Sequence, residues 1–270
     1  MKNKSILITG STGLIGNHIL RQLKDKGFKK IYALSKSKQE KHRNPNIVKI
    51  TCDLLNSNDF RKLPKKIDYL IHTAAITPTS KSQIKNYKQN LIISQNIIRY
   101  CLEFKIKNLI MISSGSVYGN NIKKKFNEKD FCYPKSEYAI NHYMCEQLFK
   151  KELLQTKVTI LRVFYPYGFY LDDYSRSLMN KIIDKLKKSI TIQITKHNKI
   201  TPLFIDDLVE IIYFFMKENI TGLFNIAGPN ELLFEEYLLA ISKSTNILLK
   251  TKENSAIESP ILPDISKLKL

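Results

Sequence analysis

Short β-branched apolar runs alternate with longer amphipathic segments over the first two-thirds of the chain. The amphipathic segments repeat their apolar residues at helical spacing, most clearly in residues 14–26, 86–104 and 137–154. Parallel strands need crossover connections of about this length, so the pattern predicts an α/β fold with a doubly wound parallel sheet. The predicted strands are residues 5–9, 30–34, 47–51, 69–73, 108–113 and 159–163.

The last third of the chain has a different pattern. Helices are predicted over residues 176–187, 205–217 and 234–244, with only short apolar runs between them. A chain of 270 residues is long enough for one large domain with a small lobe, and two equal domains would be cramped. We predict a core in residues 1–165 and a smaller lobe in residues 166–270. We expect the lobe to be partly interleaved with the core and short at its C-terminal end.

Three glycines follow the first predicted strand and open the first predicted helix. Gly10, Gly13 and Gly16 have the spacing GxxGxxG. Glycines there allow a tight turn, a close approach of the backbone to a pyrophosphate and close packing of helix on strand, while the helix N-terminus attracts the negative charge. The sequence therefore predicts a Rossmann-type dinucleotide-binding core. Its expected phosphate-binding residues are Gly10, Thr12, Gly13, Leu14, Ile15 and Gly16.

The end of the second predicted strand bears on the choice of cofactor. Ser35 and Lys36 stand there, and no acidic residue is present to bind the ribose 2′-hydroxyl of NAD. Serine and lysine suit the 2′-phosphate of NADP, although a solvated loop would explain the same residues. We expect NADP or NAD as the cofactor, with NADP favoured.

Composition excludes several classes of protein. The formal net charge of +20 comes from scattered lysines without a nucleic-acid recognition motif, so we expect no nucleic-acid partner. No apolar run reaches the roughly 18 residues of a membrane span, and the first run is too short for a secretory signal. We therefore expect no membrane partner and a cytoplasmic location. The four cysteines lack metal-binding spacing, so no metal site is predicted.

Five further segments stand in an order typical of one family: residues 52–54, 68–75, 113–119, 162–168 and 202–208. Together with the glycine turn they resemble the extended short-chain dehydrogenase/reductases, specifically the NAD(P)-dependent epimerase/dehydratase family that acts on nucleotide sugars. The likeness extends from residue 5 to about residue 268. It implies further cofactor contacts by Asp53, Leu54, Thr73, Ala74, Ala75, Asn90 and Tyr165.

The same resemblance implies the catalytic residues. Ser114 holds the place of the catalytic hydroxyl in a segment similar to the family's SSxxVYG, and Tyr138 matches the general acid/base. The family has a lysine one helical turn after that tyrosine, where its charge lowers the tyrosine's pKa. Here the position is His142, which is shorter and largely neutral at pH 7. We predict Ser114, Tyr138 and His142 as catalytic, with activity that is slower or shifted because of the histidine.

The predicted function is epimerisation or ketone reduction of a nucleotide sugar by hydride transfer. Dehydration is less expected because Gly115 and Ser116 stand where dehydratases carry an acidic pair. The alternative is a catalytically impaired NAD(P)-binding sensor or partner subunit, motivated by His142 and the short C-terminal end. The resemblance also implies a homodimer that pairs through the helices carrying Asn90 and Tyr138. The expected substrate contacts are Thr77, Gly115, Ser116 and Arg162.

Overall fold

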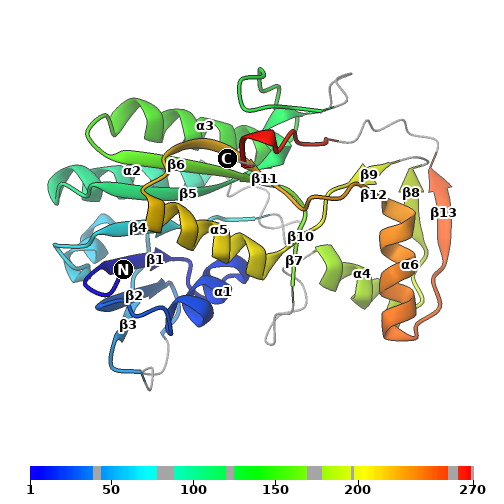
Figure 1. Cartoon of the computed structure of the whole chain (residues 1–270), viewed down its shortest axis with the longest axis horizontal. Helices are drawn as coiled ribbons and strands as arrows, with labels where there is room; N and C mark the ends of the chain where they lie inside the picture. The colour runs from blue at the N-terminus through cyan, green and yellow to red at the C-terminus, as the bar shows by residue number, and fades with distance from the viewer. Residues whose placement is uncertain are drawn as a thin grey trace.

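A seven-stranded parallel sheet forms the centre of the molecule, in the order β11-β6-β5-β4-β1-β2-β3 (Figure 1). The strand order reverses beside β1, as it does in Rossmann-type folds, so the predicted doubly wound sheet is confirmed. The computed structural model describes residues 1–38, 44–77, 88–119, 125–168, 178–195, 198–254 and 261–268.

The six strands expected from the apolar runs all lie in this sheet, and a seventh comes from the last third of the chain. The strands are β1 (Ser5–Thr9), β2 (Lys30–Ser35), β3 (Ile47–Thr51), β4 (Tyr69–His72), β5 (Asn108–Ser114), β6 (Lys157–Val163) and β11 (Gly222–Ile226). The helices that cover them are α1 (Leu14–Leu23), α2 (Lys88–Glu103), α3 (Glu137–Glu152) and α5 (Ile205–Glu218). The predicted start of the second helix, at residue 86, lies outside the described residues.

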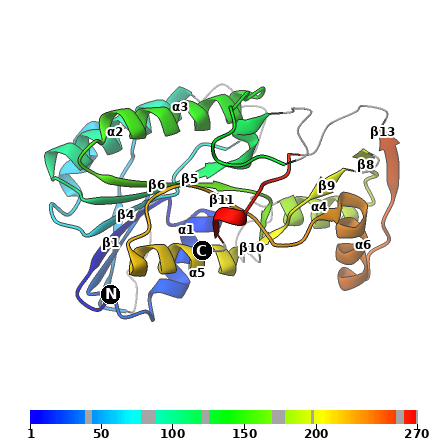
Figure 2. The same ribbon diagram turned by 45° about the horizontal axis from the view of Figure 1, so that its top comes forward.

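Successive residues of each strand point to opposite faces of the sheet, and this alternation builds two apolar cores. Ile6 and Ile8 are buried with α1 and α5 on one face, whereas Leu7 between them is buried with α2 and α3 on the other. Figure 2 shows the same division, with α2 beside α3 above the sheet and α1 beside α5 below it. Strands buried on both faces form continuous apolar runs, which is why the sequence revealed them.

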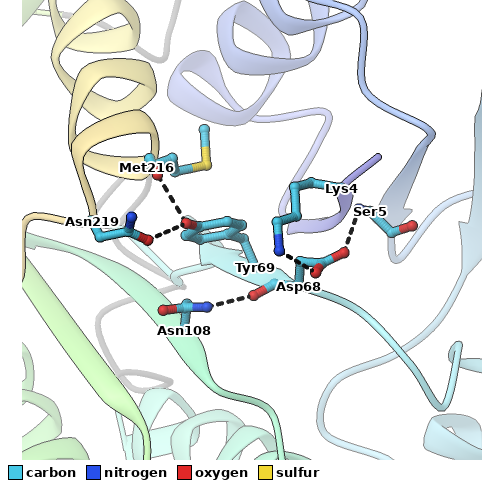
Figure 3. A network of polar contacts seen from close by, with 7 residues as sticks. All are labelled: Lys4, Ser5, Asp68, Tyr69, Asn108, Met216 and Asn219. Atoms are coloured by element: carbon cyan, nitrogen blue, oxygen red, sulfur yellow. Dashed lines mark hydrogen bonds and ion pairs between the residues drawn. The ribbon is translucent and has the colours of Figure 1, made fainter. Parts of the chain in front are cut away.

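A polar network fixes the amino-terminal edge of the sheet (Figure 3). The hydroxyl of Tyr69 lies 2.8 Å from the carbonyl oxygen of Met216 and 3.2 Å from Oδ1 of Asn219, and so joins β4 to the end of α5. Asp68, next to Tyr69, accepts a hydrogen bond from Nζ of Lys4 at 3.0 Å. Ligands of open parallel sheets bind at the opposite, carboxyl edge, which this network leaves uncovered.

A smaller lobe lies at one end of the sheet (Figure 1). Its strands pair two by two, and α4 lies beside α6. The elements are β8 (Ile192–Thr195), β9 (Lys199–Ile200), β12 (Leu232–Leu233), β13 (Thr251–Asn254), α4 (Leu178–Lys187) and α6 (Phe234–Thr245). Two further strands, β7 (Pro166–Tyr167) and β10 (Leu203–Phe204), pair between the lobe and the core. The predicted start of the helix at residue 176 lies outside the described residues.

The chain leaves the lobe after β10, returns to the main sheet through α5 and β11, and then enters the lobe again. This path is the one expected of a lobe that is interleaved with the core. Division into two units at residues 165 and 166 stays a prediction. No helix in the described part of the chain is long and apolar enough to cross a membrane.

Candidate active site

The glycine turn between β1 and α1 is closely packed. Gly10 has a φ of +66°, which L-residues rarely adopt, and a Cβ on it would lie 2.8 Å from Cα of Ala74. A Cβ on Gly16 would lie 2.2 Å from the carbonyl oxygen of Gly10. The helix can therefore approach the end of β1 only because both positions are glycine.

The N-cap position of α1 offers no side chain to cap the helix. Its N-cap residue is Gly13, and its first turn holds no acidic residue. By contrast, the N-cap residue of α3 is Ser136, whose Oγ accepts a hydrogen bond from the backbone N–H of Ala139. Uncapped N–H groups at a helix start can bind an anion, and the helix dipole favours a negative charge there. This end of α1 is suited to a phosphate group.

A cavity of about 250 Å³ opens onto this turn and onto the ends of β2 and β3; we call it the glycine-turn cavity. Lys36 and Asp53 both line this cavity, and Nζ of Lys36 lies 3.0 Å from Oδ2 of Asp53. Burial alone would raise the pKa of Asp53, but the hydrogen bond from Lys36 holds that pKa below its usual value. The predicted cofactor residues that line this cavity are Gly10, Thr12, Gly13, Ser35, Lys36, Asp53, Leu54, Thr73, Ala74 and Ala75.

A second cavity of about 280 Å³ lies beside the first, and Thr73 and Ala75 line both. We call it the serine–tyrosine cavity, because Ser114 and Tyr138 contribute to its wall from β5 and α3. Residues far apart in the sequence thus meet in one place. The predicted site residues that line this cavity are Ile15, Thr73, Ala75, Thr77, Ser114, Gly115, Ser116, Tyr138, His142 and Tyr165.

Hydrogen bonds within its own segment of the chain fix the side chain of Ser114. It is the last residue of β5 and the N-cap of the short 3-10 helix η3 (Gly115–Tyr118). Its Oγ accepts hydrogen bonds from the backbone N–H of Ser116 at 3.2 Å and from Oγ of Ser116 at 2.9 Å. Gly115 is required between them, because a Cβ there would lie 2.3 Å from the ring of Phe164.

His142 lies one helical turn after Tyr138 on α3, and the two rings meet edge to face with their centroids 4.5 Å apart. The side chain of His142 is buried, and its Nε2 has no hydrogen-bond partner among the described residues. Burial lowers the pKa of His142 to about 4, against a smaller opposing effect of Glu146. The imidazole is therefore neutral at physiological pH, in a place where the family has a cation.

Four predicted site residues line neither of the two cavities: Leu14, Gly16, Asn90 and Arg162. Asn90 bonds through both amide atoms to the backbone of Ile76, and so fixes the segment that follows β4. The guanidinium of Arg162 is buried and forms two hydrogen bonds with Glu146, at 3.0 and 2.7 Å. In this structure Arg162 ties β6 to α3, and its expected contact with the substrate stays a prediction.

Two buried polar residues near the site were not predicted. Glu146 accepts a hydrogen bond from Oγ of Ser113 at 2.6 Å in addition to those from Arg162, and so ties α3 to β5 and β6. Its spacing of eight residues from Tyr138 places both on one face of α3 and could have signalled this link. His72, at the end of β4, pairs with Oγ1 of Thr9 at 2.8 Å. His72 lies in the segment 68–75 that carries part of the family resemblance, but no role was predicted for it.

Comparisons with known proteins agree on one family. The sequence model of the NAD dependent epimerase/dehydratase family matches residues 6–227. The chain is similar to an ADP-L-glycero-D-manno-heptose-6-epimerase of Brachyspira hyodysenteriae, with 28% identity over 257 residues that cover 88% of this chain and 80% of that protein.

Solved structures of similar fold include two epimerases. One is a UDP-N-acetylglucosamine 4-epimerase of Methanobrevibacter ruminantium in complex with UDP-N-acetylmuramic acid; it has a TM-score of 0.85 and 25% identity, and the match covers 100% of this chain and 92% of that one. The other is a UDP-glucose 4-epimerase of Thermus thermophilus in complex with NAD. It has a TM-score of 0.78 and 19% identity, over 98% of this chain and 91% of that one.

Proposed function

The chain belongs to the NAD dependent epimerase/dehydratase family, as its motifs indicated, and on this premise we propose what it does. We propose that it is an NAD(P)-dependent enzyme that epimerises or reduces a nucleotide sugar by hydride transfer, with Tyr138 as the acid/base. The relatives named above are epimerases of ADP- and UDP-linked sugars, which supports a nucleotide sugar as the substrate class.

The residues present fit a nicotinamide dinucleotide. The close glycine turn and the uncapped start of α1 would hold the diphosphate. We assign the adenosine half to the glycine-turn cavity and the nicotinamide half, with the sugar, to the serine–tyrosine cavity. Thr73 and Ala75 line both cavities and would lie where the halves meet. When bound, the dinucleotide accepts or supplies the hydride.

Within the serine–tyrosine cavity, Tyr138 would exchange a proton with the oxygen of the sugar at the reacting carbon. Ser114 would orient that oxygen through a hydrogen bond, since its hydroxyl is held in place by Ser116. His142 would contact the bound ligand with its unpartnered imidazole, because a buried polar group without a hydrogen bond costs about 1–3 kcal/mol. Gly115, Ser116 and Thr77 would line the sugar.

One observation carries the proposal: the walls of two adjoining cavities hold both the glycine turn and the pair of Ser114 and Tyr138. The test is turnover of a panel of UDP-, GDP-, CDP- and ADP-linked sugars with NAD or NADP, with products identified by NMR. We expect a product from at least one of them, and Tyr138→Phe should reduce its rate at least about 100-fold. Binding of the cofactor without any turnover would favour the sensor or partner subunit instead.

We also propose a homodimer that pairs through α2 and α3. These helices lie side by side on one face of the sheet (Figure 2). Their outer surfaces expose Ile92, Ile140 and Met144, each more than a third exposed. An Ile140→Glu substitution should convert a dimer to a monomer in sedimentation velocity, because it would place a charge in the centre of an apolar contact. A wild-type chain that sediments as a monomer at micromolar concentration would contradict this.

A further inference from the structure

A third cavity, of about 190 Å³, lies where residues 263–266 meet the core and the lobe; we call it the C-terminal cavity. The other sides of its wall come from Lys125, from Thr201 between β9 and β10, and from the link between β11 and β12. It shares no described lining residue with the glycine-turn cavity or the serine–tyrosine cavity. Pockets for drug-sized ligands measure about 300–1,000 Å³, so an occupant of this one would be smaller.

Backbone hydrogen bonds fix the segments that form this wall. The N–H of Phe126 donates to the carbonyl oxygen of Leu262 at 2.8 Å, and the N–H of Asp264 donates to the carbonyl oxygen of Phe126 at 2.7 Å. On another side, the N–H of Gly228 donates to the carbonyl oxygen of Thr201 at 3.4 Å. The chain itself therefore holds the cavity open, as is usual for a ligand site.

Thr201 contributes a hydroxyl without a hydrogen bond to the wall of the C-terminal cavity. The residue is 4% exposed, and its Oγ1 is buried and has no hydrogen-bond partner among the described residues. Buried polar atoms are nearly always hydrogen-bonded, so an exception calls for a partner such as a ligand or an ordered water. A hydroxyl can both donate and accept. A polar occupant of the cavity would supply the missing bond.

An ion pair lines the same cavity. Nζ of Lys125 lies 2.7 Å from Oε1 of Glu231, and Nζ of Lys199 lies 3.3 Å from Oε2 of Glu231. The hydrogen bond from Lys125 holds the pKa of Glu231 below its usual value, so Glu231 is a carboxylate at neutral pH. A carboxylate has about four lone pairs that accept, and an ammonium has three N–H donors. Lys125 and Glu231 can therefore each form further hydrogen bonds.

This mixture of groups distinguishes between classes of ligand. A small anion would meet the carboxylates of Glu231 and Asp264, and a small cation would meet the ammonium of Lys125. A neutral hydroxyl compound can donate to Glu231 and accept from Lys125. The rings of Pro229 and Pro263 add apolar surface for the C–H groups of a ligand. Hydroxyl groups and an apolar C–H face occur together on a sugar ring.

We propose that the C-terminal cavity binds a neutral sugar of monosaccharide size, either free or at the end of an oligosaccharide. Its hydroxyl groups bond to Thr201, Glu231 and Lys125, and one face of its ring packs on the two prolines. This site is separate from the one at which the proposed reaction takes place. The C-terminal segment, red in Figure 1, contributes to both, because Ile261 lines the serine–tyrosine cavity and Pro263 lines the C-terminal cavity.

The first experiment measures binding to the full chain by saturation-transfer NMR and calorimetry. The probes are glucose, galactose, mannose and N-acetylglucosamine, each as the free sugar and at the non-reducing end of a trisaccharide. We expect at least one probe to bind with a Kd on the order of 1 mM. Tighter binding of a trisaccharide would identify the end of an oligosaccharide as the ligand, and equal or tighter binding of the monosaccharide would identify the free sugar.

The same titrations include inorganic phosphate and Mg²⁺ as charged probes. Binding of either of these without binding of any sugar would overturn the inference, and so would the absence of all binding. The titrations contain no dinucleotide and no nucleotide sugar, so a negative result leaves the proposed function standing.

Two variants test whether the sugar lies in the C-terminal cavity. Glu231→Gln keeps the size of the side chain and removes its charge, and we expect the Kd for the sugar to rise at least about tenfold. The matched control is Glu210→Gln on α5, whose carboxylate pairs with Lys26 and lines none of the three cavities. A Kd that is the same in Glu231→Gln and in wild type would show that the sugar binds elsewhere and would overturn the inference.

The second variant, Thr201→Val, separates a ligand contact from a structural role. Valine keeps the shape of the side chain and lacks the hydroxyl, so the Kd for the sugar should rise about fivefold to tenfold. The Tm of the chain without sugar should not fall, because the hydroxyl has no hydrogen bond to lose among the described residues. A lower Tm with an unchanged Kd would show that the hydroxyl serves only the fold, and would overturn its place in the site.

Discussion

The buried ion pair behind the site gives the sharpest stability prediction. The side chains of Glu146 and Arg162 are 0% and 3% exposed, and they share two hydrogen bonds. In Glu146→Leu the guanidinium of Arg162 stays buried without its carboxylate, which costs about 3–5 kcal/mol. The hydroxyl of Ser113 also loses its acceptor, for about 1 kcal/mol more. We expect the free energy of unfolding to fall by about 4–6 kcal/mol.

A double-mutant cycle measures this directly. Urea unfolding at pH 7 is followed for Glu146→Leu, Arg162→Met and the double variant. Because removal of both partners leaves no buried charge, the double variant should be more stable than the sum of the singles by at least about 2 kcal/mol. The control is Lys188→Met, whose partner Asp184 lies on the exposed surface of α4 and whose loss should cost less than about 1 kcal/mol. Additive effects of the two buried substitutions would refute the reasoning.

Three further predictions concern the site and the core. Gly16→Ala should lower the free energy of unfolding by about 1–3 kcal/mol, because the new Cβ would lie 2.2 Å from the carbonyl oxygen of Gly10. A urea midpoint equal to that of the wild type would contradict this. Lys36→Glu should weaken NADP at least about tenfold more than NAD in fluorescence titrations with the reduced cofactors; equal losses would show that Lys36 does not contact the 2′-phosphate. The pKa values of His72 and His142 are lowered to about 4 by burial, below the value near 6.5 of the unfolded chain. The unfolded chain therefore binds more protons between those values, and the free energy of unfolding should fall by about 1–2 kcal/mol per pH unit as the pH drops from 6.5 to 4, with a flatter slope in His72→Phe.

The sheet and its helices could be predicted because local patterns determine them. Strands such as β1 and β5 are buried on both faces, so they appear in the sequence as unbroken apolar runs. The glycine turn could also be predicted. Gly10 and Gly16 must be glycine because a Cβ at either position would clash with the backbone. The predicted end of the first helix at residue 26 was too late, because α1 ends at Leu23 and the polar residues beyond it follow no apolar stripe.

Pairings between distant segments could not be read from the sequence. Arg162 was expected at the substrate because arginine commonly meets phosphate, but its partner Glu146 comes from another element, and only the fold brings them together. The same holds for Asn90, which binds the backbone of Ile76, and for the ion pair of Lys36 with Asp53. The hydrogen bonds between Ser114 and Ser116 join residues close in sequence, yet they form only because η3 turns at this point.

The central claim is that one dinucleotide occupies both cavities and meets Tyr138. A crystal structure of the chain with NADP bound tests it most directly. The claim predicts the diphosphate on the backbone between Gly10 and Gly13, and the nicotinamide ring in the serine–tyrosine cavity within contact of Tyr138 and His142. A diphosphate bound elsewhere, or a nicotinamide ring outside that cavity, would contradict it.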